Sequence, residues 1–281
     1  EIPVAFTTFM ALGAWKLMQQ GIIIKKSSIV ETLGSTTVIC TDKTGTITEN
    51  SMHLKAVYDF KSDRSYNEAE FSEAVISEIL QYAMWSSEPV PFDPMEKTLH
   101  EIYSKTQPKD LRPYFKMFHE YPLEGKPPMM THIFENDKAD RIIAAKGAPE
   151  AIINECDLSE DQKNAIRKQM DFYGKKGYRL LGVAKSNFKG EQFPLKQQEI
   201  QFEFLGLVVF YDPPKKDIQN VFRQIAEAGI KIKVITGDNA QTTESIALQA
   251  GIPNKSIPVN GDEITDLPEA ALRKIAQEKV L

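Results

Sequence analysis

An aspartate followed by a lysine, hydroxyl residues and a glycine stands at positions 42–46. Asp42 and Lys43 come directly after residues 36–41, whose apolar and β-branched side chains predict a buried strand. The carboxyl end of such a strand is where open α/β sheets place their reactive groups. The Asp42 carboxylate could therefore attack a phosphoryl group and form an aspartyl-phosphate, with Lys43, Thr44 and backbone N–H groups available to phosphate oxygens. The alternative is a strand that ends in an ordinary Asx turn.

A second group of the same kind follows the predicted strand at residues 230–235. Thr236, Gly237 and Asp238 come next, and Gly237 would permit a close backbone approach to a phosphate. Neighbouring parallel strands would place these residues at the same sheet edge as Asp42. The alternative is a strand-to-helix turn with Asn239 as N-cap.

Two further segments combine charge with turn-forming residues. Lys146 and Gly147 follow a predicted strand at 141–145, so the lysine could lie along a flat base while its ammonium reaches a phosphate. The alternative is a solvated lysine in a turn before a helix opened by Pro149. Asp93 and Glu96 have the spacing of a helix start, with Asp93 as N-cap, and this is compatible with a ligand role for Glu96.

Composition is typical of a globular protein of about two domains. The chain has 281 residues, and its net charge of −5 gives no reason to expect a nucleic-acid partner. Cys40 and Cys156 form no paired motif, which fits a reduced compartment. The histidines show no metal-ligand spacing and are expected to be surface or packing residues; they are His53, His100, His119 and His132.

The amino-terminal residues 2–15 are almost wholly apolar and are followed by Lys16, Lys25 and Lys26. The run is too short to span a bilayer alone and lacks the features of a signal peptide. One interpretation is the cytoplasmic half of a transmembrane helix, with basic residues on the cytoplasmic side. The other is a buried core helix.

The longer motifs resemble those of P-type cation-transporting ATPases of the P2-like ion pumps. The matching segments are DKTGTITEN at 42–50, KGAPE at 146–150, GYRLLGVA at 177–184 and TGD at 236–238. The resemblance implies that Asp42 takes the γ-phosphate of ATP, that Lys43, Thr44, Thr236, Gly237 and Asp238 complete the catalytic group, and that Mg²⁺ is held by Asp42 and the Thr44 carbonyl.

The resemblance also implies a set of ATP contacts, namely Glu96, Lys126, Lys146, Gly147, Arg179 and Asp212. The chain departs from the family at the adenine pocket, where Leu123 replaces the usual aromatic residue and Pro128 stands near the position of a usual lysine. It also has Lys215 where the family often has arginine, which keeps the charge but loses bidentate pairing.

The fold implied is α/β, with a haloacid-dehalogenase-like Rossmann phosphorylation domain, incomplete here, and a large inserted α+β nucleotide-binding domain. Residues 1–34 would be the end of a transmembrane helix and its stalk. Residues 35–50 and 204–281 would form the phosphorylation domain, and residues 51–203 the nucleotide-binding domain. Residues 204–210 are expected to be a strand of the parallel sheet.

A pump of this family would sit in the cell membrane, with this portion facing the cytoplasm and a cation as transported partner. The family's actuator loop, its second metal-binding aspartate and its catalytic lysine are not found in the sequence, so we expect little ATP turnover by this chain alone.

Two other classes of function remain open. A soluble haloacid-dehalogenase phosphatase usually carries a second acid two residues after its nucleophile, where this chain has Thr44. A nucleotide-binding module without catalysis would bind ATP without releasing phosphate.

Overall fold

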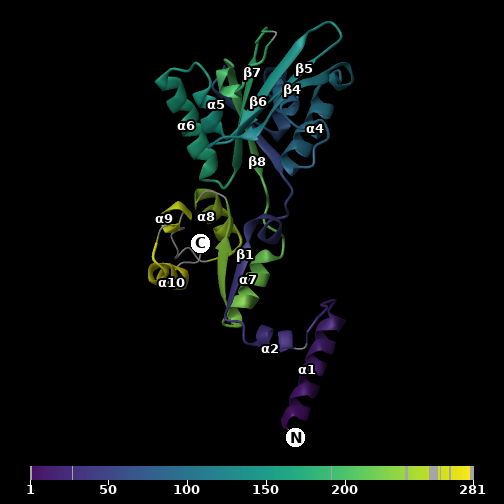
Figure 1. Ribbon diagram of the computed structural model, residues 1–281, viewed down its shortest axis with the longest axis vertical. Helices are drawn as coiled ribbons and strands as arrows, with labels where there is room; N and C mark the ends of the chain where they lie inside the picture. The colour runs from purple at the N-terminus through teal and green to yellow at the C-terminus, as the bar shows by residue number, and fades with distance from the viewer. Residues whose placement is uncertain are drawn as a thin grey trace.

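A seven-stranded antiparallel sheet forms the largest layer of the computed structural model (Figure 1), which describes residues 2–26, 28–190, 192–237, 240–252, 259, 261–265 and 267–278. Across the sheet the strands run in the order β3-β2-β8-β7-β6-β5-β4. They are β2 (His53–Asp59), β3 (Arg64–Asn67), β4 (Lys116–Glu124), β5 (Met129–Glu135), β6 (Arg141–Gly147), β7 (Arg179–Ser186) and β8 (Glu203–Tyr211). Short helical turns lie at Glu68–Glu70, Arg112–Tyr114 and Gln197–Glu199.

Helices cover both faces of this sheet. One face packs on α3 (Ala74–Trp85) and α4 (Pro94–Thr106), and the other on α5 (Pro149–Asn154) and α6 (Glu160–Gly174). Because side chains alternate along a strand, Leu207 lies in the core beneath α5 and α6, while its neighbour Val208 lies in the core beneath α3 and α4. The sheet is therefore a buried central layer, which explains why its strands carry long apolar runs.

A smaller unit lies at the end of the large sheet from which β8 leaves (Figure 1). Its strands β1 (Val38–Asp42) and β9 (Lys231–Ile235) are parallel. The chain forms α7 (Ile218–Glu227) before β9, and then α8 (Ala240–Gln249), α9 (Gly261–Ile264) and α10 (Glu269–Glu278) after it. Side chains from α7, β9 and α8 form a separate small core with Ile47.

The amino-terminal segment extends away from both sheets (Figure 1) as α1 (Ile2–Gln19) and α2 (Ser28–Gly34). Met10 is buried, but most large apolar side chains of α1 are exposed, including Phe9 and Trp15. The alternative of a buried core helix is therefore wrong for this structure. Among the described residues, no helix is both long enough and apolar enough to cross a bilayer.

Two predictions about strands need correction. Residues 204–210 do form a strand, but β8 is antiparallel to β2 and β7 in the large sheet instead of parallel in the small one. A continuous apolar run is typical of any strand covered on both faces, so it does not distinguish these two settings. The strand before Asp42 is not buried, because β1 pairs with β9 alone in the described part of the chain, and Val38 and Cys40 are exposed.

Gly206 has the least room for a side chain among the described glycines of the large sheet. A Cβ atom there would lie 2.0 Å from the Tyr58 carbonyl oxygen on β2. Gly206→Ala should lower the free energy of unfolding by about 1–3 kcal/mol, since a backbone atom cannot yield as a side chain does. Urea unfolding measures this. Gly34→Ala is the matched control, because a Cβ there has open space; equal stability losses in the two variants would contradict the packing argument.

Candidate functional site

Asp42 ends β1 and is exposed, and its Oδ1 accepts a hydrogen bond from the Lys43 N–H at 2.8 Å. The chain then makes the tight turn Lys43–Ile47, in which Thr44 departs from helical geometry and Gly45 has a φ of +75°. Glycine is suited to that left-handed conformation. The side chains of Lys43 and Ile47 are buried and anchor the turn, while Asp42 is exposed at its start.

Thr236 and Gly237 lie beside this edge. β1 and β9 are in parallel register with Asp42 opposite Ile235, so the segment after β9 starts next to the end of β1. The predicted neighbourhood of Asp42 and Thr236 is thus confirmed. Thr236 is half-buried and Gly237 exposed, while Asp238 lies outside the described residues.

The chain passes twice between the small and the large unit, once before β2 and once after β8. Asp212 links these two segments. It is 5% exposed, and its carboxylate accepts from the Thr48 hydroxyl at 2.6 Å and from the Ser51 N–H at 3.1 Å. Lys215 completes the joint, since its Nζ donates to the Gly45 carbonyl at 2.8 Å. In this conformation Asp212, which was predicted to contact ATP, holds the turn after Asp42 to the segment that leaves β8.

Lys146 and Glu96 form a buried ion pair under the large sheet. The sequence predicted that Lys146 follows a strand, but Lys146 lies within β6. Its Nζ is 2.6 Å from Glu96 Oε1 and donates to Ser87 Oγ at 2.7 Å. Lys146 is 5% and Glu96 7% exposed, so the alternative of a solvated lysine is wrong. Burial lowers the pKa of the Lys146 ammonium, and the Glu96 carboxylate opposes that fall.

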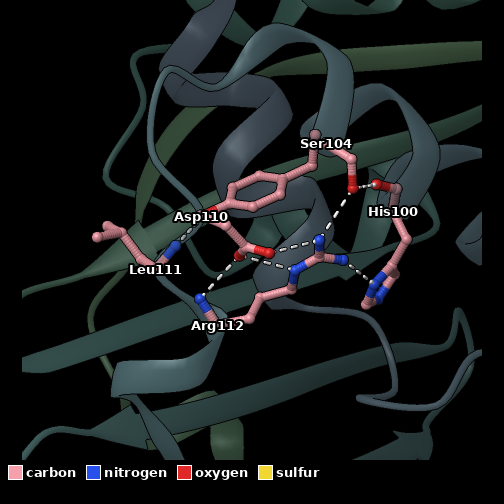
Figure 2. Close-up of polar contacts among 6 residues, drawn as sticks. His100, Ser104, Asp110, Leu111 and Arg112 are labelled. Carbon is pink, nitrogen blue, oxygen red and sulfur yellow. Dashed lines mark hydrogen bonds and ion pairs between the residues drawn. The ribbon is translucent and has the colours of Figure 1, made fainter.

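Glu96 reaches this pair from the first turn of α4. The predicted helix start is confirmed, because the Asp93 carboxylate accepts hydrogen bonds from the Met95 and Glu96 N–H groups. Figure 2 shows how the other end of α4 is fixed: Arg112 donates to Asp110, to Ser104 Oγ and to His100 Nδ1. The hydrogen bonds that Asp110 accepts from Arg112 lower the pKa of the Asp110 carboxyl.

Arg179 begins β7 at the wall of a cavity of about 340 Å³. Three segments that the motifs had marked separately line this cavity. Its wall includes Met95 beside Glu96, Arg179, and Ala148 directly after Gly147. Thr242 on α8 contributes from the small unit, so the cavity opens between the large sheet and the helix that follows Thr236 and Gly237.

Gly147 packs against the turn of the β4–β5 hairpin, the turn that also carries Lys126. A Cβ on Gly147 would be 2.5 Å from the Pro128 carbonyl, so only glycine fits against this turn. The Ala148 N–H donates to the same carbonyl at 2.9 Å, and Pro149 opens α5 as predicted. Lys126 and Leu123 are exposed. They extend from the hairpin and are not part of the buried pair of Lys146 and Glu96.

The site residues thus form two groups. One gathers around the edge after β1 and β9, and the other around Lys146, Glu96 and the cavity. Sequence reasoning missed Ser87 and Thr48, which are buried and hold Lys146 and Asp212 respectively. Thr48 was within a recognised motif, whereas nothing local marks Ser87.

Comparison with known proteins shows to which family the chain belongs. Residues 89–217 match the family described as "P-type ATPase, cytoplasmic domain N". A "Probable cation-transporting P-type ATPase" of Mycoplasma genitalium is 33% identical over 260 residues, which are 89% of this chain and 29% of that protein. The chain belongs to the P-type ATPases.

Two further relatives extend the comparison. A "Calcium-transporting ATPase" of Bacillus subtilis is 26% identical over 99% of this chain and 36% of its own length. The human "Calcium-transporting ATPase type 2C member 1" is 28% identical over 98% of this chain and 33% of its own length. The chain spans about a third of the length of these P-type ATPases.

The buried Lys146–Glu96 pair predicts a pH-dependent loss of stability in Glu96→Gln. Removing the carboxylate leaves a buried ammonium without a counter-charge, which should cost about 3 kcal/mol near pH 7. The pKa of Lys146 is already below its unfolded value and falls further in the variant. The folded variant therefore binds fewer protons than the unfolded chain, and its free energy of unfolding rises with pH as Lys146 discharges. Urea unfolding between pH 7 and pH 10 should show the deficit shrinking.

Glu78→Gln is the control for this experiment. It removes the partner of Lys185 from an ion pair of the same 2.6 Å length, but the Glu78 side chain is 50% exposed. That change should cost no more than about 1 kcal/mol. A Glu96→Gln deficit that is equally small, or that grows as pH rises, would contradict the description of a buried, charged pair.

Proposed function

We propose that this chain is the ATP-binding and phosphorylated portion of an ATP-driven cation pump. The observation that carries the proposal is the parallel register of β1 and β9, which brings Asp42 of the DKTGT segment and Thr236 and Gly237 of the TGD segment to one sheet edge. The cavity beside Arg179, which Thr242 of α8 also lines, gives a nucleotide a place between the two units. Membership of the P-type ATPases supports the same reading.

In this proposal the adenine end of ATP lies against the large sheet. Glu96 accepts from the base, and Lys146 and Gly147 border it. Lys146 uses two of its three N–H donors on Ser87 and Glu96 in the described structure, which leaves one for a ligand. Arg179 is suited to phosphate because its guanidinium offers a planar set of donors. Lys126 would approach from the β4–β5 hairpin, and Asp212 from the ribose side.

Asp42 would then be the nucleophile. One carboxylate oxygen attacks the γ-phosphorus in line, a new phosphorus–oxygen bond forms, and the bond to ADP breaks. Lys43, Thr44, Thr236, Gly237 and Asp238 would position and neutralise the transferred group, which is where nearly all the rate of such reactions arises. The Lys43 N–H donates to the Oδ1 atom of Asp42 and so helps to orient the carboxylate.

The donor set at this edge fits Mg²⁺. The exposed Asp42 carboxylate and the Thr44 carbonyl are hard oxygen ligands of the kind Mg²⁺ prefers, and the open turn leaves room for water and phosphate oxygens. Bound there, the ion would supply positive charge to the phosphate oxygens. The chain's own contribution is to hold Asp42 through the hydrogen bond from Lys43.

The remaining parts of the proposal concern the whole pump. Residues 35–50 and the segment from β8 onward would form a haloacid-dehalogenase-like Rossmann phosphorylation domain, and residues from 51 into β8 the nucleotide-binding domain. The exposed apolar helix α1 and the following α2 would continue a membrane helix and stalk. A cation would be the transported partner in the cell membrane, with this portion on the cytoplasmic side.

Asp42→Asn should abolish phosphorylation from ATP in the full-length pump. The amide cannot act as the nucleophile, so the acid-stable, hydroxylamine-labile label from γ-labelled ATP should vanish. Asp63→Asn, a change at an aspartate in the β2–β3 turn, should keep the label. Label that persists in Asp42→Asn would show that another residue is the acceptor.

Arg179→Ala should weaken ATP binding to the 281-residue chain by about 1.5–3 kcal/mol, the usual cost of losing one charge-assisted hydrogen bond. Calorimetric titration measures the affinity directly. Arg167→Ala is the matched control, since Arg167 is an exposed residue of α6 that pairs with Glu160. Equal affinities of wild type and Arg179→Ala would move the nucleotide away from this cavity.

A further inference from the structure

Three potential metal ligands converge on the face of the large sheet that also carries Lys146. They are Glu88, Glu120 and His132, and one ligand atom from each lies within 4.8 Å of the others. Glu120 and His132 are paired across β4 and β5, so their side chains leave the same face of the sheet. Glu88 arrives from the segment after α3. The grouping is therefore produced by sheet register and is invisible to sequence spacing.

The histidine has a defined tautomer. His132 Nδ1 lies 3.1 Å from the Ser87 backbone carbonyl oxygen, which can only accept a hydrogen bond. Nδ1 must therefore carry the ring proton, and Nε2 presents a lone pair. Metal-binding histidines are commonly oriented in this way, by donating their other N–H to a carbonyl.

The state of His132 Nε2, a buried atom without a hydrogen-bond partner in the described structure, is the observation that points to a ligand. His132 is 0% exposed, and Nε2 has no hydrogen-bond partner among the residues the structure describes. A buried polar atom without a partner is costly. One ring nitrogen of His132 lies within 4.8 Å of a carboxylate oxygen of Glu88, which is half-buried, and of one of Glu120, which is exposed. A cation bound between the three would satisfy the lone pair and separate the two negative charges.

We propose that Glu88, Glu120 and His132 form a binding site for a divalent transition-metal ion, with Zn²⁺ as the best-suited ion. One imidazole nitrogen with two carboxylate oxygens is a ligand set of the kind found in open zinc sites, where water takes the remaining position. The imidazole favours Zn²⁺ over Ca²⁺ and Mg²⁺, which prefer oxygen ligands alone.

The proposed site is separate from the Asp42 edge but adjoins the buried ion pair. Ser87 orients His132 through its backbone carbonyl and accepts from Lys146 through its hydroxyl. An ion there would tie the segment after α3 to the edge of β4 and β5. Its predicted role is structural, and its binding does not depend on phosphoryl transfer or on the proposed pump.

The test is titration of the nucleotide-free 281-residue chain with Zn²⁺ alone, followed by calorimetry, and with Co²⁺, whose visible absorption reports its coordination. Cys40→Ser serves as the background, because the Cys40 thiol is exposed and could bind either ion. We expect one ion per chain. Glu120→Gln should weaken Zn²⁺ binding by at least about tenfold, the lower range seen when even an outer-shell partner is lost.

Glu124→Gln is the matched control, because Glu124 is an exposed glutamate on the same strand outside the cluster. It should bind Zn²⁺ as the background does, whereas His132→Asn should lose the Co²⁺ spectrum. Glu120 is exposed, so its variant tests the site even if His132→Asn does not fold. No stoichiometric binding, or binding unchanged in Glu120→Gln, would overturn the proposal.

Discussion

The position of the small unit against the large one depends on the hydrogen bonds of Asp212, which join the segment after β8 to the segment before β2. Its buried carboxylate accepts from Thr48 and Ser51, and Lys215 binds the turn after Asp42 from the same side. Hydrogen bonds to a charged group contribute about 1.5–3 kcal/mol each. These few contacts hold the end of the small sheet to the base of the large one, so the distance between Asp42 and the cavity beside Arg179 depends on them.

A second constraint acts inside the large unit. The ammonium of Lys146 is enclosed by Ser87 and Glu96, which arrive from the ends of α3 and α4. Burying two charges gives little net stability compared with apolar packing, but breaking one partner is expensive. The pair therefore fixes how the helices meet the sheet more than it stabilises the fold. The same Ser87 orients His132, so one serine organises both polar clusters on this face.

Local features of the fold were predictable from the sequence, and long-range ones were not. The N-cap at Asp93, the start of α5 at Pro149 and the parallel pairing of β1 with β9 follow from turn chemistry and from the order of elements. The antiparallel place of β8 could not be predicted, because a run buried on both faces looks alike in either kind of sheet.

In the candidate site, too, local relations were predictable from the sequence and long-range ones were not. Motif residues such as Asp42 and Thr236 fell at one strand edge as expected, because each follows its strand directly. The burial of Lys146 depends on Glu96, 50 residues away, and the His132 cluster depends on sheet register. Neither relation leaves a pattern in the sequence.

In the proposed function, ATP bridges the two units, with its base near Lys146 and its γ-phosphate at Asp42. The most direct measurement is a high-resolution structure with a non-hydrolysable ATP analogue and Mg²⁺. We expect the adenine beside Glu96 and Lys146, the phosphates at Arg179, and the terminal phosphate within contact of the Asp42 carboxylate. An analogue bound elsewhere, or one whose terminal phosphate points away from β1 and β9, would contradict it.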